Sequence, residues 1–155
     1  MSEPSSRSLI LNQFLPYRMV NIAKRISDSC SEIYFNDFSI SIPEWRILAR
    51  LAEDDRQNAR DIGDVTFMDK SKVSRAVKLL EDKGYLFKEK DSKDNRATYL
   101  SLTKTGRQLY HDIAPRALDW EGQLISALDI KEYRDLLQTL EKLDRQLDAI
   151  DGIQS

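Results

Sequence analysis

Residues 69–84 read DKSKVSRAVKLLEDKG, which is the pattern of an amphipathic helix with its own start and stop signals. Asp69 suits the N-cap, and Gly84 suits the left-handed residue that follows a last turn. Apolar side chains recur at i, i+3, i+4 and i+7 and predict one buried face. The opposite face combines serines with long cations. The buried face consists of Val73, Ala76, Val77 and Leu80, and the exposed one of Ser71, Ser74, Arg75 and Lys78, with Lys70 and Lys72 at the N-terminal end.

The charge around this helix is unlike that of the rest of the chain. Residues 69–107 hold eleven Lys/Arg and six Asp/Glu, a net charge of +5, whereas the remainder carries −7. Such an island indicates either an anionic partner or a solvated surface. Cations in the first turns oppose the helix dipole, so stability alone does not explain them. Serines allow close approach and long cations reach phosphates or base edges, which favours DNA contact.

Three helices are predicted before this segment, over residues 16–36, 42–52 and 59–65. Ser41 and Glu44 form a capping box, in which each side chain accepts from the other residue's amide. Asn58 is the expected cap of the short third helix, in which Ile62 and Val65 are expected to be buried. A polar break over residues 54–57 separates the second helix from the third.

After Gly84 the spacing of apolar residues changes from that of a helix to the alternation typical of strands. Two strands are predicted, Leu86–Lys90 and Ala97–Leu102, joined by the polar loop 91–95. Thr103 then caps a long helix that contains Pro115, where we expect a kink or a fresh start. The order of helix, helix, short helix, helix and hairpin predicts a winged helix-turn-helix, a mainly α fold with a small β-hairpin wing (α+β).

The two ends of the chain carry apolar surface that a small core does not need. An apolar arm spans Leu9–Leu15, and the last helix, capped by Asp129, has a nearly heptad stripe over Tyr133–Ile150. The stripe either packs within one chain or joins two copies. We expect a homodimer in which the N- and C-terminal helices form the dimerisation region. The expected parts of this single intertwined domain are residues 1–36, the DNA-binding lobe 37–104, and the C-terminal helices 105–155.

Several classes of protein are excluded by composition. The longest apolar run is three residues, so no membrane span is expected, and no signal-peptide stretch opens the chain, which favours a cytoplasmic location. One cysteine and one histidine allow no disulfide framework within the chain and disfavour a metal site. The five glycines are isolated, without a P-loop or nucleophile elbow. We therefore expect neither an enzyme nor a cofactor.

Five short motifs together resemble the MarR family of bacterial transcription regulators. They are the segment 69–84, Asp91-x-x-Asp94-x-Arg96, Leu102-Thr103-x-x-Gly106, LPYR at 15–18 and IPEWR at 42–46. The resemblance implies a homodimer that binds double-stranded DNA at a near-palindromic operator, with half-sites about 10 bp apart. The wing tip departs from the family, since Ser92-Lys93 stands where members often have Pro or Arg. The expected DNA-binding residues are Lys70, Ser71, Lys72, Ser74, Arg75, Lys78, Lys93 and Arg96.

Two triggers fit a regulator of this kind. The resemblance implies a repressor released by a small aromatic acid or its thioester, and Tyr17, Arg18, Asn21 and Trp45 offer stacking faces, an amide and a cation for such an effector. Equally, Trp45 could belong to the core and Arg18 could pair with an acid of a second copy. Cys30 could sense oxidation, although its apolar neighbours favour an inert thiol. A helical adaptor that does not bind DNA is the alternative from another class.

Overall fold

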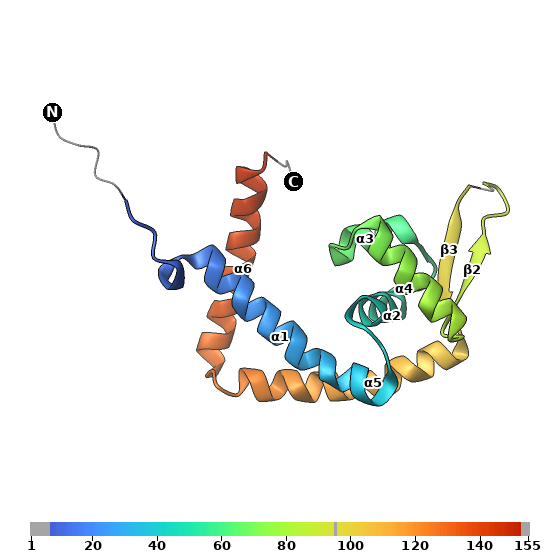
Figure 1. The fold of residues 1–155 in the computed structure, drawn as a ribbon, viewed down its shortest axis with the longest axis horizontal. Coiled ribbons are helices and arrows are strands. Elements are labelled where there is room, and N and C mark those ends of the chain that lie inside the picture. The colour runs from blue at the N-terminus through green and yellow to red at the C-terminus, as the bar shows by residue number, and fades with distance from the viewer. Residues whose placement is uncertain (1–6, 95, 153–155) are drawn as a thin grey trace. The chain divides into compact units, whose positions relative to one another are not determined.

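The computed structural model describes residues 7–94 and 96–152, which form six α-helices, one short 3₁₀ helix and a three-stranded antiparallel sheet (Figure 1). Residues 1–6 of the expected N-terminal part and Asn95 of the hairpin loop lie outside this description. Two compact units are divided between Arg116 and Ala117, within α5. The elements are η1 (Leu11–Gln13), α1 (Leu15–Phe38), α2 (Ile42–Glu53), β1 (Gln57–Asn58), α3 (Ala59–Thr66), α4 (Lys70–Asp82), β2 (Leu86–Lys90), β3 (Thr98–Leu102), α5 (Lys104–Ile125) and α6 (Ile130–Ile150).

Side-chain caps fix where the helices begin. The Ser41–Glu44 capping box is present at α2, and Asn58 accepts from the amide of Asp61 at α3. At α4 the Asp69 carboxylate accepts from the Lys72 amide at 2.8 Å. Each cap satisfies a backbone N–H that has no partner inside its helix. These three predicted starts are confirmed, as are those of α5 at Thr103 and of α6 at Asp129.

The core of the first unit lies where α2, α3 and α4 meet the sheet. The predicted inner face of α4 is confirmed, since Val73, Ala76, Val77 and Leu80 are all buried. The facing helix α2 contributes Ile47, Leu48 and Leu51, which are fully buried. Removing these side chains from water is the main stabilising term, at about 1.5–3 kcal/mol for each large side chain. This core holds α4 by one face and leaves the other exposed.

The sheet contains a strand that the sequence did not predict. β1 pairs antiparallel with β3 in the order β1-β3-β2, with Gln57 opposite Leu100. Its two residues are polar and too few to show an alternation, so they read as a break. The side chain of Gln57 is buried, and its amide group donates to the carbonyls of Asp54 and Arg50. β1 thereby joins the start of α3 to the wing.

One expectation for α3 is wrong, and one of the two alternatives for α5 is excluded. Val65 is 52% exposed rather than buried, because α3 packs only through Ile62 and Gly63. Phe67, which follows α3 in a left-handed conformation (φ 56°), is 96% exposed. The long helix makes no fresh start at Pro115, since α5 runs continuously from Lys104 to Ile125.

The second unit is helical and exposes its apolar stripe. None of the residues of α6 is buried, and Leu136, Leu137, Leu140, Leu147 and Ile150 are all exposed. A stripe of this length on a soluble helix is typical of a surface that another helix covers. Within the described residues, no helix has the length and apolar character needed to cross a membrane.

Candidate nucleic-acid interface

The outer face of α4 is basic, hydroxyl-rich and open to solvent. Ser71, Ser74 and Arg75 are exposed, as are Lys70, Lys72 and Lys78. Among the described residues, only Lys78 of these four cations forms an ion pair, with Asp82 at 3.5 Å. The Asp69 carboxylate is bonded to the backbone amide of Lys72 rather than paired with a lysine ammonium. The charges of Lys70 and Lys72 therefore remain available to an anionic partner. The face predicted from the sequence is therefore brought together on one side of one helix.

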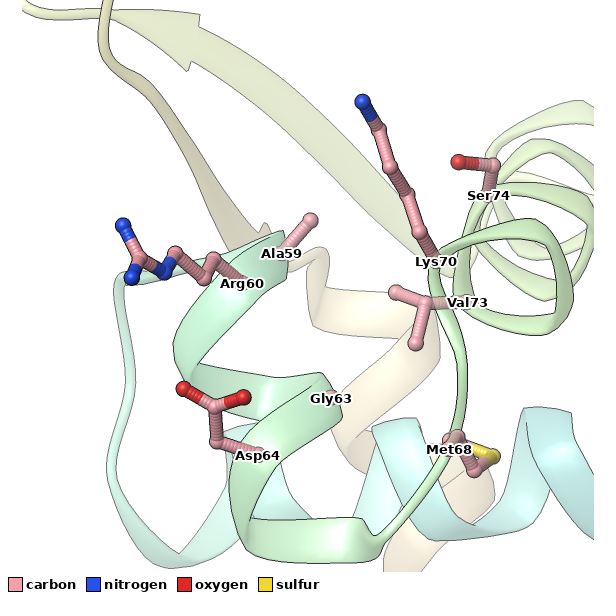
Figure 2. Close-up of a pocket in the computed structure, with 8 residues that line it drawn as sticks. All are labelled: Ala59, Arg60, Gly63, Asp64, Met68, Lys70, Val73 and Ser74. Carbon is pink, nitrogen blue, oxygen red and sulfur yellow. The ribbon is translucent and has the colours of Figure 1, made fainter.

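A hollow of about 410 Å³ lies between α3 and α4 (Figure 2). Gly63 lets the two helices approach closely, since a Cβ atom there would lie 3.1 Å from the Met68 carbonyl oxygen and 3.3 Å from Val73 Cγ2. Lys70 and Ser74 line the hollow from α4, opposite Arg60 and Asp64 on α3 (Figure 2). This arrangement adds Arg60 to the basic surface. The sequence did not single out Arg60, because its place beside the cations of α4 depends on how closely α3 and α4 pack.

The wing loop is ordered by hydrogen bonds to its own backbone. Asp91 accepts from the Lys93 amide and Asp94 from the Arg96 amide, each at 3.0 Å. The bonds that these carboxylates accept come from amides, and the Arg96 side chain is exposed. Lys93 is exposed as well. The described part of the loop thus has two carboxylates bonded to backbone amides and presents two exposed cations at the end of the hairpin, which projects away from the helices (Figure 1).

Long-range pairs connect the segment before β1 to the wing and to α5. The guanidinium of Arg56 lies 4.3 Å from the centre of the Tyr99 ring and 3.8 Å from the Glu89 carboxylate. Asp55 pairs with Arg107 at 2.7 Å, which joins the chain before β1 to the start of α5. The sequence showed residues 54–57 only as a polar break. Nothing in it pointed to these partners, which lie more than 30 residues away.

The four residues predicted to bind an effector are not all in one place. Tyr17, Arg18 and Asn21 line a hollow of about 590 Å³ on α1. Trp45 is absent from that lining and stacks instead between Tyr34 and Tyr110, at centroid distances of 5.5 and 5.9 Å. This position corresponds to the core-packing alternative for Trp45.

The other chemically notable groups of the first unit belong to its core. Burial raises the pKa of Tyr34 to about 12, and the nearby Cys30 adds to that rise while Arg46 opposes it. Cys30 is partly buried against the same core. Over the described ranges, no group of three or more His, Cys, Asp or Glu side chains is placed to hold a metal ion.

Known proteins similar to this chain are regulators of transcription. The model of the MarR family matches residues 38–97, which run from the end of α1 to the wing loop. The regulator SarZ of Staphylococcus aureus (strain MRSA252) is 26% identical over 81 residues, 52% of this chain and about half (55%) of SarZ. FarR of Neisseria gonorrhoeae is 26% identical over 117 residues, 74% of this chain and 80% of FarR.

A solved structure extends the similarity to nearly the whole chain. The MarR/EmrR family transcriptional regulator from Acinetobacter sp. ADP1 superposes with a TM-score of 0.82 at 29% identity. The match covers 91% of this chain and 99% of that one. These relatives are transcriptional regulators and not enzymes, and the helices and three-stranded sheet match their winged-helix structures. The chain is therefore similar to the MarR family in sequence over residues 38–97 and in fold over nearly its whole length.

Proposed function

We propose that this protein is a transcriptional regulator that binds double-stranded DNA through α4 and the wing. The observation that carries the proposal is the two-sided character of α4, which is apolar where it meets the core and basic where it meets solvent. A helix of this kind fits the major groove, and counterion release from phosphates drives its binding. Arg75 and Lys78 reach base edges or phosphates. Lys70, Ser71, Lys72 and Ser74 contact phosphates, and Lys93 and Arg96 enter the minor groove.

The proposed working form is a homodimer on a near-palindromic operator. Support comes from the uncovered apolar surface of both ends of the chain, the stripe on α6 and the exposed arm at Leu9–Leu15. Twofold symmetry places two copies of α4 in successive major grooves about 10 bp apart. A helical adaptor that does not bind DNA would have no use for the uncompensated cations of α4.

The proposed signal is a small aromatic acid or its thioester, which releases a repressor from its operator. Tyr17 and Arg18 share the hollow on α1 with Asn21, so a stacking face, a cation and an amide are available to one ligand. A ligand weakens DNA binding only through its different affinity for the free and bound states, typically by about 1–3 kcal/mol. Oxidation of Cys30 is the competing signal, and its position against the core does not favour it.

The DNA-binding proposal can be tested without knowing the operator. A duplex is selected from a randomised pool with the wild-type protein, and its affinity is compared with that of random duplex. Arg75→Ala should weaken binding of the selected duplex by about 1–3 kcal/mol per site. Arg145→Ala removes an exposed arginine of α6 outside the stripe and should leave binding unchanged. Wild-type affinity in Arg75→Ala would contradict the assignment of α4.

The effector proposal has its own measurement. Benzoate, 4-hydroxybenzoate and benzoyl-coenzyme A are titrated against the complex with the selected duplex. Arg18→Ala should keep DNA binding and lose the response, because it removes the cation that holds the ligand's negative charge. Lys24→Ala is the control, since Lys24 is an exposed cation on the same helix that pairs with Asp28. A peroxide response abolished by Cys30→Ser, with no response to these acids, would replace this proposal by the redox alternative.

A further inference from the structure

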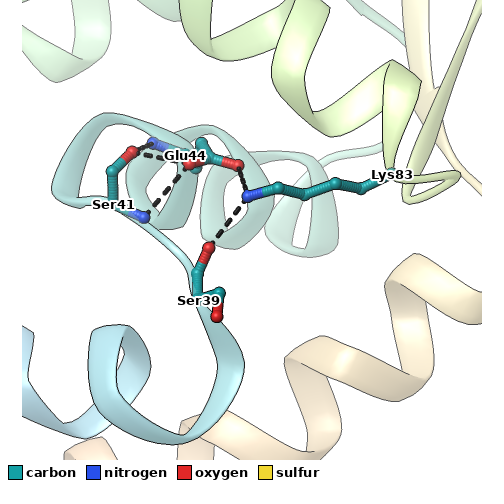
Figure 3. A network of polar contacts seen from close by, with 4 residues as sticks. All are labelled: Ser39, Ser41, Glu44 and Lys83. Atoms are coloured by element: carbon teal, nitrogen blue, oxygen red, sulfur yellow. Dashed lines mark hydrogen bonds and ion pairs between the residues drawn. The ribbon is translucent and has the colours of Figure 1, made fainter.

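A buried carboxylate connects α2 to the end of α4 (Figure 3). Glu44 is 2% exposed, and its Oε2 atom lies 2.8 Å from the ammonium nitrogen of Lys83, the C-cap residue of α4. The same ammonium donates to the carbonyl oxygen of Ser39, also at 2.8 Å. Lys83, whose side chain is 34% exposed, therefore extends from the end of α4 to two acceptors from other elements (Figure 3).

The charge of Glu44 is not needed for helix capping. Its Oε1 atom accepts from the amide and the hydroxyl of Ser41, at 3.2 and 2.9 Å. A glutamine completes a capping box equally well, because only a side-chain oxygen is required. A buried carboxylate, by contrast, costs free energy unless it is paired and hydrogen-bonded. The negative charge thus serves the contact with Lys83.

The three residues that meet here end or begin three helices. Ser39 ends α1 in a left-handed conformation (φ 56°), Glu44 lies in the first turn of α2, and Lys83 ends α4. The apolar contacts of α4 resist separation of the helices but have no preferred direction. A hydrogen-bonded ion pair has both a fixed length and a fixed direction. It can therefore add a directional constraint at the end of α4 to the orientation that side-chain packing already favours.

We propose that Lys83 and Glu44 are positioning residues that fix the orientation of α4 against α1 and α2 and thereby set the sequence specificity of DNA binding. The inference rests on the proposed function, since specificity has meaning only if α4 reads DNA. Base contacts require the helix to sit in the groove with hydrogen-bond accuracy, whereas attraction to phosphates tolerates a tilt. Loss of the Lys83–Glu44 ion pair should thus weaken binding to the selected duplex far more than binding to random duplex.

The experiment measures the ratio of affinities for the selected duplex and for random duplex, at a temperature where circular dichroism shows each variant to be folded. Lys83→Met removes the ammonium, and Lys83→Arg keeps a cation that can reach both acceptors. If Lys83→Met does not fold because Glu44 is left unpaired, the double variant Glu44→Gln, Lys83→Met removes both charges and keeps the capping oxygen. Lys24→Met is the matched control, since it removes a lysine from the exposed pair with Asp28.

We expect the ratio to fall about fivefold to a hundredfold in Lys83→Met or in the double variant, with random-duplex affinity nearly unchanged, and to recover in Lys83→Arg. The control should keep the wild-type ratio. A variant that loses thermal stability but keeps the ratio would overturn the proposal and leave a purely structural pair. Equal losses on both duplexes, with a salt dependence reduced by about one phosphate contact, would overturn it in favour of direct contact of Lys83 with DNA. Failure of the wild-type protein to select any duplex would refute the proposed function itself.

Discussion

Replacing Gly106 by alanine should destabilise the junction between the wing and α5. A Cβ atom at this position would lie 2.0 Å from the carbonyl oxygen of Tyr85 and 2.9 Å from its carbon, where real contacts stay beyond 3.0 Å. The obstacle is backbone, and that oxygen already accepts the amide of Thr103 at 3.1 Å. Relief therefore requires the start of β2 to move away from α5.

The expected size follows from three terms. Overpacking against an immobile group costs about 1–3 kcal/mol, and weakening the Tyr85–Thr103 hydrogen bond about 1 kcal/mol. The higher helix propensity of alanine returns about 1 kcal/mol. Gly122→Ala in the same helix is the matched control, because its Cβ would meet nothing within 4 Å and only the propensity gain applies.

Thermal and urea unfolding at one fixed protomer concentration would measure the difference. The two alanine variants should differ by about 2–4 kcal/mol, or roughly 5–15 °C in melting temperature for a chain of this size. Gly106→Ala with the stability of the wild-type protein would refute the reasoning, since it would mean that α5 and β2 separate without cost.

Three further outcomes are expected. Phe67→Gly should raise the free energy of unfolding in urea by about 0.5–1 kcal/mol, because a left-handed phenylalanine that is almost fully exposed loses strain and no packing; a fall would mean that the ring has a partner. Burial raises the pKa of Tyr34 to about 12, so the stability that its neutral hydroxyl contributes is fully present below pH 10. Between pH 10 and 12 the free energy of unfolding should decline by about 1.4 kcal/mol per pH unit. Urea unfolding should show this decline in the wild-type protein and not in Tyr34→Phe. Sedimentation should show a dimer at micromolar concentration, and a compact 18 kDa species would contradict the proposed assembly.

Local signals explain what the sequence could predict. The caps at Ser41, Asn58 and Asp69 act within three or four residues, so the starts of these helices could be predicted from neighbouring residues in the sequence. The periodic face of α4 is likewise a property of one element, and it identified both the core side and the exposed side correctly. The order of the predicted helices and the hairpin indicated the winged-helix arrangement, which the structure confirms.

What the sequence could not show depends on contacts between distant segments. β1 has only two residues, and its pairing with β3 crosses about 40 positions. Val65 fits a helical apolar pattern, but α3 is too short to bury more than one side of itself. The reach of Lys83 to Glu44 spans 39 residues. Trp45 looked equally suited to a ligand and to the core, and only its stacking against Tyr34 and Tyr110 distinguishes the two positions.

The uneven charge of the chain has a consequence for kinetics. Residues 69–107 carry +5 and the rest −7, so the positive charge is concentrated on α4, the hairpin and the first turn of α5. A polyanion attracts this segment over distances near the Debye length and repels the acidic remainder, so encounters in the wrong orientation are short-lived. The rate of productive association should then decrease steeply as salt is added, while the rate of dissociation changes less. A protein whose net charge is only −2 can in this way be captured by a polyanion on one side alone.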